Sequence, residues 1–218
     1  MTRDGAVRLA GFSVGLMSLG MLVWLIVDVV SGSTQGFDLS IRDSIHRYAS
    51  PALTAAAQAI TILGSILFLS VASLASIIGL LLARLRREAG RLGCLMAGAL
   101  GIENGLKYSI HRVRPEAFFG VDPTTYSFPS GHSLLSLCFY VSVAVLIARR
   151  LRGGLGRFAV WTAAALAIVA IGLSRIYLGV HYPTDVIGGY LTAALWTGLV
   201  FSVLPTGRTR ARGSDAGA

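Results

Sequence analysis

Charged residues are scarce in this sequence. Asp, Glu, Lys and Arg make up 13% of its 218 residues, whereas a soluble domain carries about 25%. Residues 9–27 and 51–83 contain no charged side chain at all. A chain with so little charge cannot surround its core with a polar surface. This excludes an ordinary soluble domain and indicates a protein whose apolar surface faces a lipid bilayer.

Cysteine and lysine are scarce as well. The two cysteines, Cys94 and Cys138, fall in apolar stretches without the spacing of a metal site, so we interpret them as small packing residues. Of the 19 basic residues, all are arginine except Lys107. Because the chain uses arginine everywhere else, the lysine indicates a need for a compact ammonium group at this position.

Six apolar stretches predict six transmembrane helices, since a spanning helix needs about 20 mainly apolar residues. The stretches, some of them completed by flanking residues, cover 9–27, 65–83, 92–102, 133–148, 158–173 and 186–204. Residues 51–83 would reach about 50 Å as one helix, against a hydrocarbon core of about 30 Å. We therefore divide them at Gly64-Ser65 into an interfacial helix and a spanning helix.

The first outer loop, residues 32–51, contains a second helical pattern. Ile41, Ile45 and Tyr48 recur at helical spacing, with Asp38 or Ser40 as N-cap, which predicts a short amphipathic helix on the membrane surface. We thus expect an all-α integral membrane protein with six transmembrane helices and short interfacial helices in this loop. Residues 1–205 would form this single domain, followed by a polar, disordered cytoplasmic tail over residues 206–218.

Most basic residues fall on one side of the predicted membrane. Thirteen of the 19 lie on the side of both termini, which places the termini in the cytoplasm. This placement accounts for the net charge of +9 without a nucleic-acid partner and predicts a multi-pass protein of the cytoplasmic cell membrane. The other six lie on the outer side and need a separate reason: Arg42, Arg47, Lys107, Arg112, Arg114 and Arg175.

Polar residues that a bilayer disfavours gather at the outer ends of the last four predicted spans. Lys107 and Arg114 follow the third span, residues 129–132 begin the fourth, Arg175 ends the fifth, and residues 181–185 begin the sixth. Ionisable groups at membrane depth are costly and usually functional. Because these ends share one face, we expect their side chains to form a single site.

The cations and the helix start in this site suit a phosphoryl group. Lys107, Arg114 and Arg175 can neutralise a dianion, and arginine adds paired hydrogen bonds. Ser130 and Gly131 lead into a helix whose N-terminal amides form a cradle for an anion. The sequence therefore predicts a phosphate-binding site at the outer face.

Two histidines supply the chemistry in this interpretation. Asp185 lies four residues after His181 and can fix the tautomer of that ring, which leaves the other ring nitrogen to attack phosphorus. His132 is then available to protonate the departing oxygen, and water would cleave the phosphohistidine.

Other residues near the site have simpler interpretations. Glu103 lies four residues before Lys107, and we interpret the two as an ion pair that orients the lysine. A role for this carboxylate in substrate selection or proton transfer is the alternative. We interpret Arg112 as a solvated cation, with reinforcement of the local positive potential as the alternative. The aromatic residues of loop 111–129, Phe128 among them, would serve as membrane anchors or as a rim that holds the lipid.

Three motifs in this region carry a family resemblance. Residues 107–115 read K-x6-R-P, residues 129–132 read P-S-G-H, and residues 174–185 read S-R-x5-H-x3-D. In this order they resemble the signature of the type 2 phosphatidic acid phosphatase family, which also includes vanadium haloperoxidases and bacterial acid phosphatases. The six-span layout extends the resemblance to nearly the whole chain.

The resemblance implies His181 as nucleophile, Asp185 as its partner and His132 as general acid, with no metal and no cofactor. It also implies phosphate ligands at Lys107, Arg114, Ser130, Gly131 and Arg175. The expected activity is hydrolysis of a lipid phosphate or pyrophosphate at the extracytoplasmic face. Phosphatidic acid, phosphatidylglycerol phosphate and undecaprenyl pyrophosphate are candidate substrates, and the bilayer is the other partner, with no obligate protein partner.

Three alternatives use the same site. A lipid phosphotransferase would pass the phosphoryl group from the histidine to an acceptor other than water. A non-enzymatic phosphate-binding membrane protein would not need nucleophile, acid and carboxylate together. A haloperoxidase is disfavoured because those relatives are soluble.

Overall fold

The computed structural model describes residues 3–120 and 124–204. Eight α-helices and no strand occur in these ranges, which confirms the predicted all-α class. The predicted tail 206–218 lies outside the described residues. The helices are α1 (Arg3–Ser31), α2 (Gln35–His46), α3 (Pro51–Ile62), α4 (Ile66–Leu82), α5 (Arg86–Ile110), α6 (Gly131–Ala148), α7 (Gly154–Tyr177) and α8 (Pro183–Val203).

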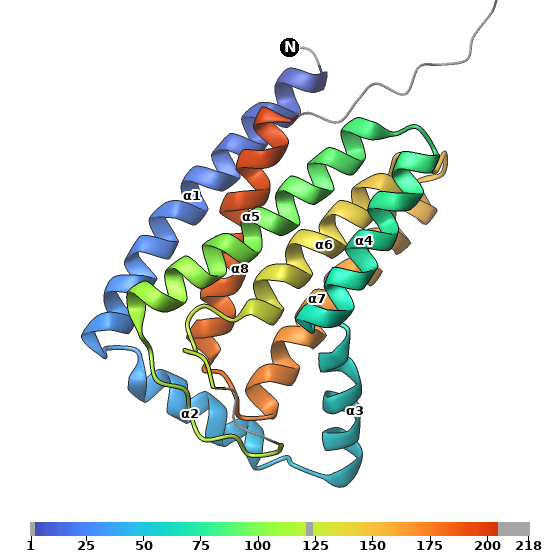
Figure 1. Cartoon of the computed structure of the whole chain (residues 1–218). Helices are drawn as coiled ribbons and strands as arrows, with labels where there is room; N and C mark the ends of the chain where they lie inside the picture. The colour runs from blue at the N-terminus through green and yellow to red at the C-terminus, as the bar shows by residue number, and fades with distance from the viewer. Residues whose placement is uncertain (1–2, 121–123, 205–218) are drawn as a thin grey trace, which may run out of the picture.

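The long helices form a bundle that carries α2 and α3 at one end. α1 packs along α8, α6 packs against α7 and α8, and α5 lies against α4 and α6. α2 and α3 lie at the end where α5 finishes and where α6 and α8 begin (Figure 1). The start of α1 and the end of α8 lie at the opposite end, with the α4–α5 and α6–α7 connections (Figure 1).

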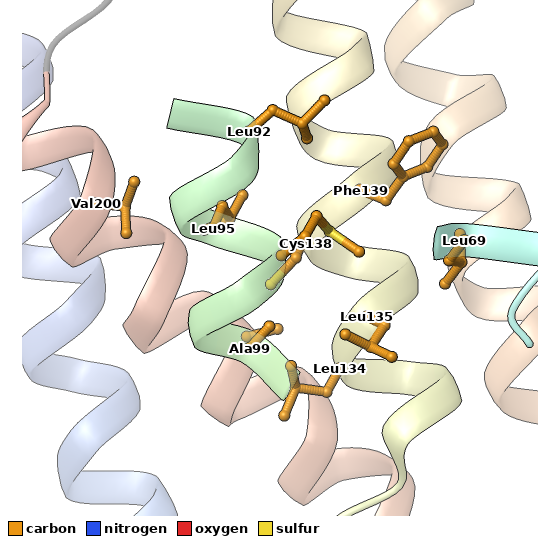
Figure 2. Close-up of a cluster of buried hydrophobic side chains, with 11 residues drawn as sticks. Leu69, Leu92, Leu95, Ala99, Leu134, Leu135, Cys138, Phe139 and Val200 are labelled. Atoms are coloured by element: carbon orange, nitrogen blue, oxygen red, sulfur yellow. The ribbon is translucent and has the colours of Figure 1, made fainter. Parts of the chain in front are cut away.

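A buried apolar cluster joins four of these helices (Figure 2). Its side chains are Leu69 of α4, Leu92, Leu95, Met96 and Ala99 of α5, Leu134, Leu135, Cys138 and Phe139 of α6, and Ala193 and Val200 of α8. The α5 members follow helical spacing, so one stripe of α5 faces the bundle. The same stripe continues to Glu103 and Lys107, which are also buried. The core of α5 thus leads directly to the two charged residues expected in the site.

The apolar stretch 51–83 is broken where the sequence predicts. α3 ends at Ile62, α4 begins at Ile66, and the two helices are bent by 42° relative to one another. Ser50 and Ser65 each accept a hydrogen bond from a backbone amide in the first turn of the helix that follows, at 3.3 and 3.2 Å. Two successive N-caps therefore make two helices from one apolar run.

Four helices in the described part of the chain are long and apolar enough to cross a membrane, namely α1, α6, α7 and α8. The α3–α4 pair meets the same standard only as one broken span or a re-entrant loop. α5 is 25 residues long, but its apolar part includes Glu103 and Lys107. The structure thus has four or five candidate spans, and the expected six spans and interfacial helices stay predictions.

α2 differs from the predicted surface helix in its start and in the side that faces the protein. Its N-cap is Thr34, so the two expected caps, Asp38 and Ser40, were wrong and lie inside the helix. Asp38 and Arg42 are buried, whereas Ile41 is 37% exposed. The polar side of α2 therefore packs inward, because Asp38 and Arg42 find hydrogen-bond partners on neighbouring segments.

Candidate active site

The helix ends that carry the motifs meet at one end of the bundle. They are the end of α5, the start of α6, the end of α7 and the start of α8 (Figure 1). His132, at the start of α6, lies in the electrostatic field of Lys107, Arg114, Arg175 and the His181 ring. The structure thus brings the predicted cations together around two histidines.

The start of α8 fixes the histidine–carboxylate pair. Tyr182 is the N-cap and Pro183 takes the first helical position, which places Asp185 in the first turn. The Asp185 carboxylate accepts a hydrogen bond from the Tyr182 amide at 2.9 Å and lies 3.4 Å from Nδ1 of His181. Both side chains are buried. The His181 ring is therefore held with Nδ1 toward the carboxylate.

Arg114 contacts the other side of the same ring. Its Nη1 lies 3.0 Å from Nε2 of His181 and donates to the Val180 carbonyl at 2.8 Å. Its Nε and Nη2 donate to the carbonyl and hydroxyl of Thr125, at 2.5 and 3.0 Å. Because a guanidinium can only donate, Nε2 carries the lone pair of His181 and Nδ1 carries the proton.

The surroundings of His181 favour its neutral form. Burial lowers the pKa of His181 to about 4, Asp185 opposes this change, and Arg114 and Arg175 add to it. A neutral imidazole with its lone pair on Nε2, directed into a cationic site, is the form that a histidine nucleophile requires.

Lys107 and Glu103 form a buried ion pair beside the start of α6. The lysine Nζ lies 2.6 Å from Oε1 of Glu103. A Cβ on Gly131 would collide with the Glu103 carboxylate, so the glycine allows α5 and α6 to approach closely. Oε2 of Glu103 is buried and has no hydrogen-bond partner among the described residues. The ion pair is present as expected, and it packs directly against the predicted phosphate cradle.

Arg175 and His132 contact the break between α3 and α4, which the motifs do not include. Nη1 of Arg175 donates to the Thr61 hydroxyl at 2.7 Å. A Cβ on Gly64 would collide with Ile171 and lie 3.2 Å from the His132 ring. The Gly64-Ser65 break was visible in the sequence as a helix boundary, but its approach to the site depends on tertiary packing.

The start of α6 is tied to the start of α8. The Ser130 amide donates to the Asp185 carbonyl at 3.0 Å, and the Ser133 hydroxyl donates to the Ser130 hydroxyl at 3.2 Å. A Cβ on Gly189 would collide with the Ser130 carbonyl, so this contact requires glycine. Since the Ser130 amide is already bonded, the amides that follow it in the first turn of α6 are the ones that can face an anion.

Two residues of the loop after α5 differ from their predicted roles. Arg112 was expected to be solvated, but it donates to Oδ1 of Asp185 and to Oδ2 of Asp38, both at 2.6 Å. Phe128 was expected at the membrane surface, but it is fully buried and packs against Gly188. Spacing could not reveal either contact because the partners are distant in sequence. The excess of outer cations was the one signal that pointed to Arg112.

The chain belongs to the PAP2 superfamily, whose sequence profile matches residues 88–208. It is 41% identical over 86 residues to phosphatidylglycerophosphatase B of Bacillus subtilis, 33% identical over 126 residues to lipid A 1-phosphatase of Rhizobium etli, and 30% identical over 107 residues to undecaprenyl-diphosphatase of Sulfolobus acidocaldarius. The alignments cover 39%, 49% and 46% of this chain and 42%, 50% and 48% of the relatives, so the chain spans about half the length of the curated relatives it matches.

Solved structures extend the similarity to most of the fold. The transmembrane PAP2-type phosphatidylglycerolphosphate phosphatase of Bacillus subtilis superposes with a TM-score of 0.80 at 27% identity, over 87% of this chain and 94% of that one. LpxE of Aquifex aeolicus shares the fold with a TM-score of 0.58 at 22% identity, over 77% and 94% of the two chains. The protein is therefore a multi-pass membrane protein of this superfamily.

Proposed function

We propose that this protein is a metal-independent membrane phosphatase that hydrolyses a lipid phosphate or pyrophosphate through a phosphohistidine on His181. The setting of this histidine carries the proposal, because Nδ1 faces Asp185 at 3.4 Å and Nε2 lies 3.0 Å from a guanidinium nitrogen of Arg114. The nucleophilic lone pair is thus directed to the place where cations would hold a phosphoryl group. Relatives named for phosphatidylglycerophosphate, undecaprenyl diphosphate and lipid A support lipid phosphates as the substrate class.

The reaction has two steps in this proposal. In the first, Nε2 of His181 forms a bond to phosphorus while the bond from phosphorus to the leaving oxygen breaks, and His132 donates a proton to that oxygen. Asp185 stabilises the ring while it is cationic. In the second, water attacks phosphorus, His132 takes up a proton of the water, and the phosphorus–nitrogen bond breaks to release inorganic phosphate.

Three cations hold the transferred group. Lys107, Arg114 and Arg175 offset its charge, and the first turn of α6 adds backbone amides. Nε of Arg175 is buried without a hydrogen-bond partner in the part of the chain that the structure describes, so it can donate to a phosphoryl oxygen. The substrate dianion also neutralises part of the positive charge around His132. This favours the protonated form that His132 needs as general acid.

The site faces the outside in this proposal, where the lipid would enter from the outer leaflet. The α4–α5 and α6–α7 connections, at the end of the bundle opposite the site, are rich in arginine (Figure 1). Cytoplasmic loops usually carry this excess of basic residues. The structure and the charge pattern are thus consistent with cytoplasmic termini and an extracytoplasmic active site.

The test is phosphate release by the purified full-length protein in excess EDTA. The panel would contain phosphatidic acid, phosphatidylglycerol phosphate, undecaprenyl pyrophosphate and lipid A. We expect release that survives EDTA and disappears in His181→Ala. His111→Asn is the matched control, because His111 is exposed and has a φ of 53°, which asparagine tolerates.

Each outcome of this assay has a definite meaning. Release in the wild type and the control, but not in His181→Ala, supports the proposal, and the order of rates identifies the substrate class. Release that is equal in all three proteins, or absent from all three, contradicts it. Loss of the lipid phosphate only when an alcohol acceptor is added would instead identify a phosphotransferase.

A further inference from the structure

A buried chain of charges lies behind the nucleophile. Asp185 uses one carboxylate oxygen toward His181 and the other toward Arg112, which in turn reaches Asp38 of α2. The two Arg112 bonds to the carboxylates are both 2.6 Å long. Asp38 and Asp185 are 0% exposed at their side chains, and Arg112 is 13% exposed. Three residues, Asp185, Arg112 and Asp38, thus connect the reactive ring of His181 to α2 at the end of the bundle.

Further contacts fix this chain in one arrangement. Asp38 accepts hydrogen bonds from the Thr184 amide at 3.0 Å and the Thr184 hydroxyl at 2.7 Å, so it also caps the start of α8. Arg112 donates to the same hydroxyl at 2.8 Å, and its guanidinium carbon lies 4.4 Å from the centre of the Tyr182 ring. The guanidinium fork is therefore held on both its edge and its face.

Asp38 compensates the positive charge that Arg112 places beside Asp185. A guanidinium beside Asp185 would by itself cancel the negative charge that stabilises a cationic His181 ring. Asp38 contributes a second negative charge, so Asp38, Arg112 and Asp185 together carry a net charge of about −1, as a lone carboxylate would. The ring needs this charge when Nε2 bonds to phosphorus, because it is then cationic.

We propose that Asp38 and Arg112 are positioning residues for the nucleophile. They orient the Asp185 carboxylate and set the net charge that it presents to His181, and they thereby link the position of α2 to the reactivity of the ring. The inference rests on the proposed function, since it assigns the two residues a role in forming the phosphohistidine.

The first test measures the charge behind His181 without any turnover. The four histidines of the full-length protein in detergent micelles would be labelled with ¹³C and titrated by NMR, and His181→Ala would assign the signal. Arg112→Gln removes a cation and should raise the pKa of His181, whereas Asp38→Asn removes an anion and should lower it, each by about 1 pH unit. The other charged and titratable groups that face His181 stay in place: Asp185, Arg114, Arg175 and His132.

The opposite signs separate this role from a merely structural one. A substitution that only loosened the site would let water reach the ring and would raise its depressed pKa in both variants. Asp43→Asn and Arg47→Gln are matched controls. Asp43 lies in α2 and Arg47 is the C-cap of α2, both residues are exposed, and they carry the same charges as Asp38 and Arg112. Neither control should change the titration of His181.

The second test measures the rate of phosphohistidine formation. We expect Arg112→Gln and Asp38→Asn to lower kcat by about 10- to 100-fold while KM changes little, because neither residue is among the proposed phosphate ligands and both are bonded to the start of α8. Arg112→Lys keeps the charge but loses the fork, so it should leave the pKa of His181 near the wild-type value and restore only part of kcat. If Arg112→Gln does not fold, Arg112→Lys and the nearly isosteric Asp38→Asn carry the test.

The proposal is overturned if the folded variants keep wild-type kcat, or if both move the pKa of His181 in the same direction. Failure of the proposed function is a separate result. A wild-type protein that releases no phosphate would contradict the phosphatase, whereas opposite pKa changes in the two variants would still establish that the charges are coupled.

Discussion

The active site has two sides that are built in different ways. On the α5–α8 side, groups such as His181 and Arg175 lie within a few residues of a helix end and face the place where phosphate would bind. On the α2–α4 side, Asp38 accepts a hydrogen bond from Arg112, Thr61 accepts one from Arg175, and Gly64 lies close to the His132 ring. The comparison teaches that changes on the first side should abolish chemistry, whereas changes on the second should shift charge, position or affinity.

The largest effect should come from Asp185, where the two sides meet. Asp185→Asn keeps the shape of the side chain but favours the wrong tautomer of His181, because the amide can donate toward Nδ1. We expect phosphoenzyme formation in a rapid-quench experiment to fall on the order of 10³-fold. Asp43→Asn, an exposed change of the same kind, should have no effect. A loss of less than about 10-fold would contradict the role of the carboxylate.

The second-largest effect should come from a steric change within the α5–α8 side. Gly131→Ala places a methyl group on the Glu103 carboxylate and should lower kcat by about 100-fold, because the ion pair with Lys107 and the start of α6 must separate. Gly101→Ala is the control, since a Cβ at that position would have no described atom within 4 Å apart from its chain neighbours and the adjoining backbone of α5. Activity of the Gly131→Ala, Glu103→Ala double variant, compared with the two single variants, then shows whether the collision is the cause. Additive losses would exclude it.

Much of the α5–α8 side could be predicted from sequence because its charged pairs join residues that are close together in the sequence. The histidine–carboxylate spacing over residues 181–185 and the lysine–glutamate spacing over residues 103–107 follow from the helical period, and the structure contains both pairs. On the α2–α4 side, the break at Gly64-Ser65 could also be predicted, from the length of the apolar stretch 51–83. The contacts that the α2–α4 side makes with the site could not be predicted, because Asp38 meets Thr184 and Arg112 only through tertiary packing. The prediction of the number of spans was limited as well, because the buried face of α5 carries both apolar core side chains and the charged residues Glu103 and Lys107.

A smaller effect should come from the α2–α4 side at Thr61. Thr61→Val removes the acceptor that holds Arg175 and should raise KM by about 5-fold with kcat nearly unchanged. Thr54→Val is the matched control, because its hydroxyl bonds Tyr177, a residue with no predicted contact to phosphate. Equal KM values for both variants would show that Thr61 does not position Arg175.

The smallest effect should be the response to pH between 7 and 5. Since the pKa of His181 is about 4, the neutral nucleophile persists through this range, and loss of the nucleophile should lower the rate of phosphoenzyme formation only as pH drops toward 4. The rates would be corrected for ionisation of the substrate, whose second pKa lies near 6 for a phosphate monoester. A His181 NMR titration centred near 6.5 would contradict this expectation.

The same pKa also gives the sign for stability. Between about pH 6.5 and 4, His181 is protonated in the unfolded chain but neutral in the folded protein. The free energy of unfolding therefore decreases as pH falls through this range, and His181 causes no further decrease below pH 4. Thermal unfolding of wild type and His181→Ala across this range would isolate the contribution, which should vanish in the variant.

The most direct test of the central claim is to trap the phosphorylated enzyme. Protein mixed with ³²P-labelled phosphatidylglycerol phosphate would be quenched in base, which preserves phosphohistidine, and the labelled peptide identified by mass spectrometry. The account predicts label on His181 that is lost to water on dilution, is absent from His181→Ala and persists in His111→Asn. Label on another residue, or phosphate release by the wild type with no labelled histidine under single-turnover conditions, would contradict it.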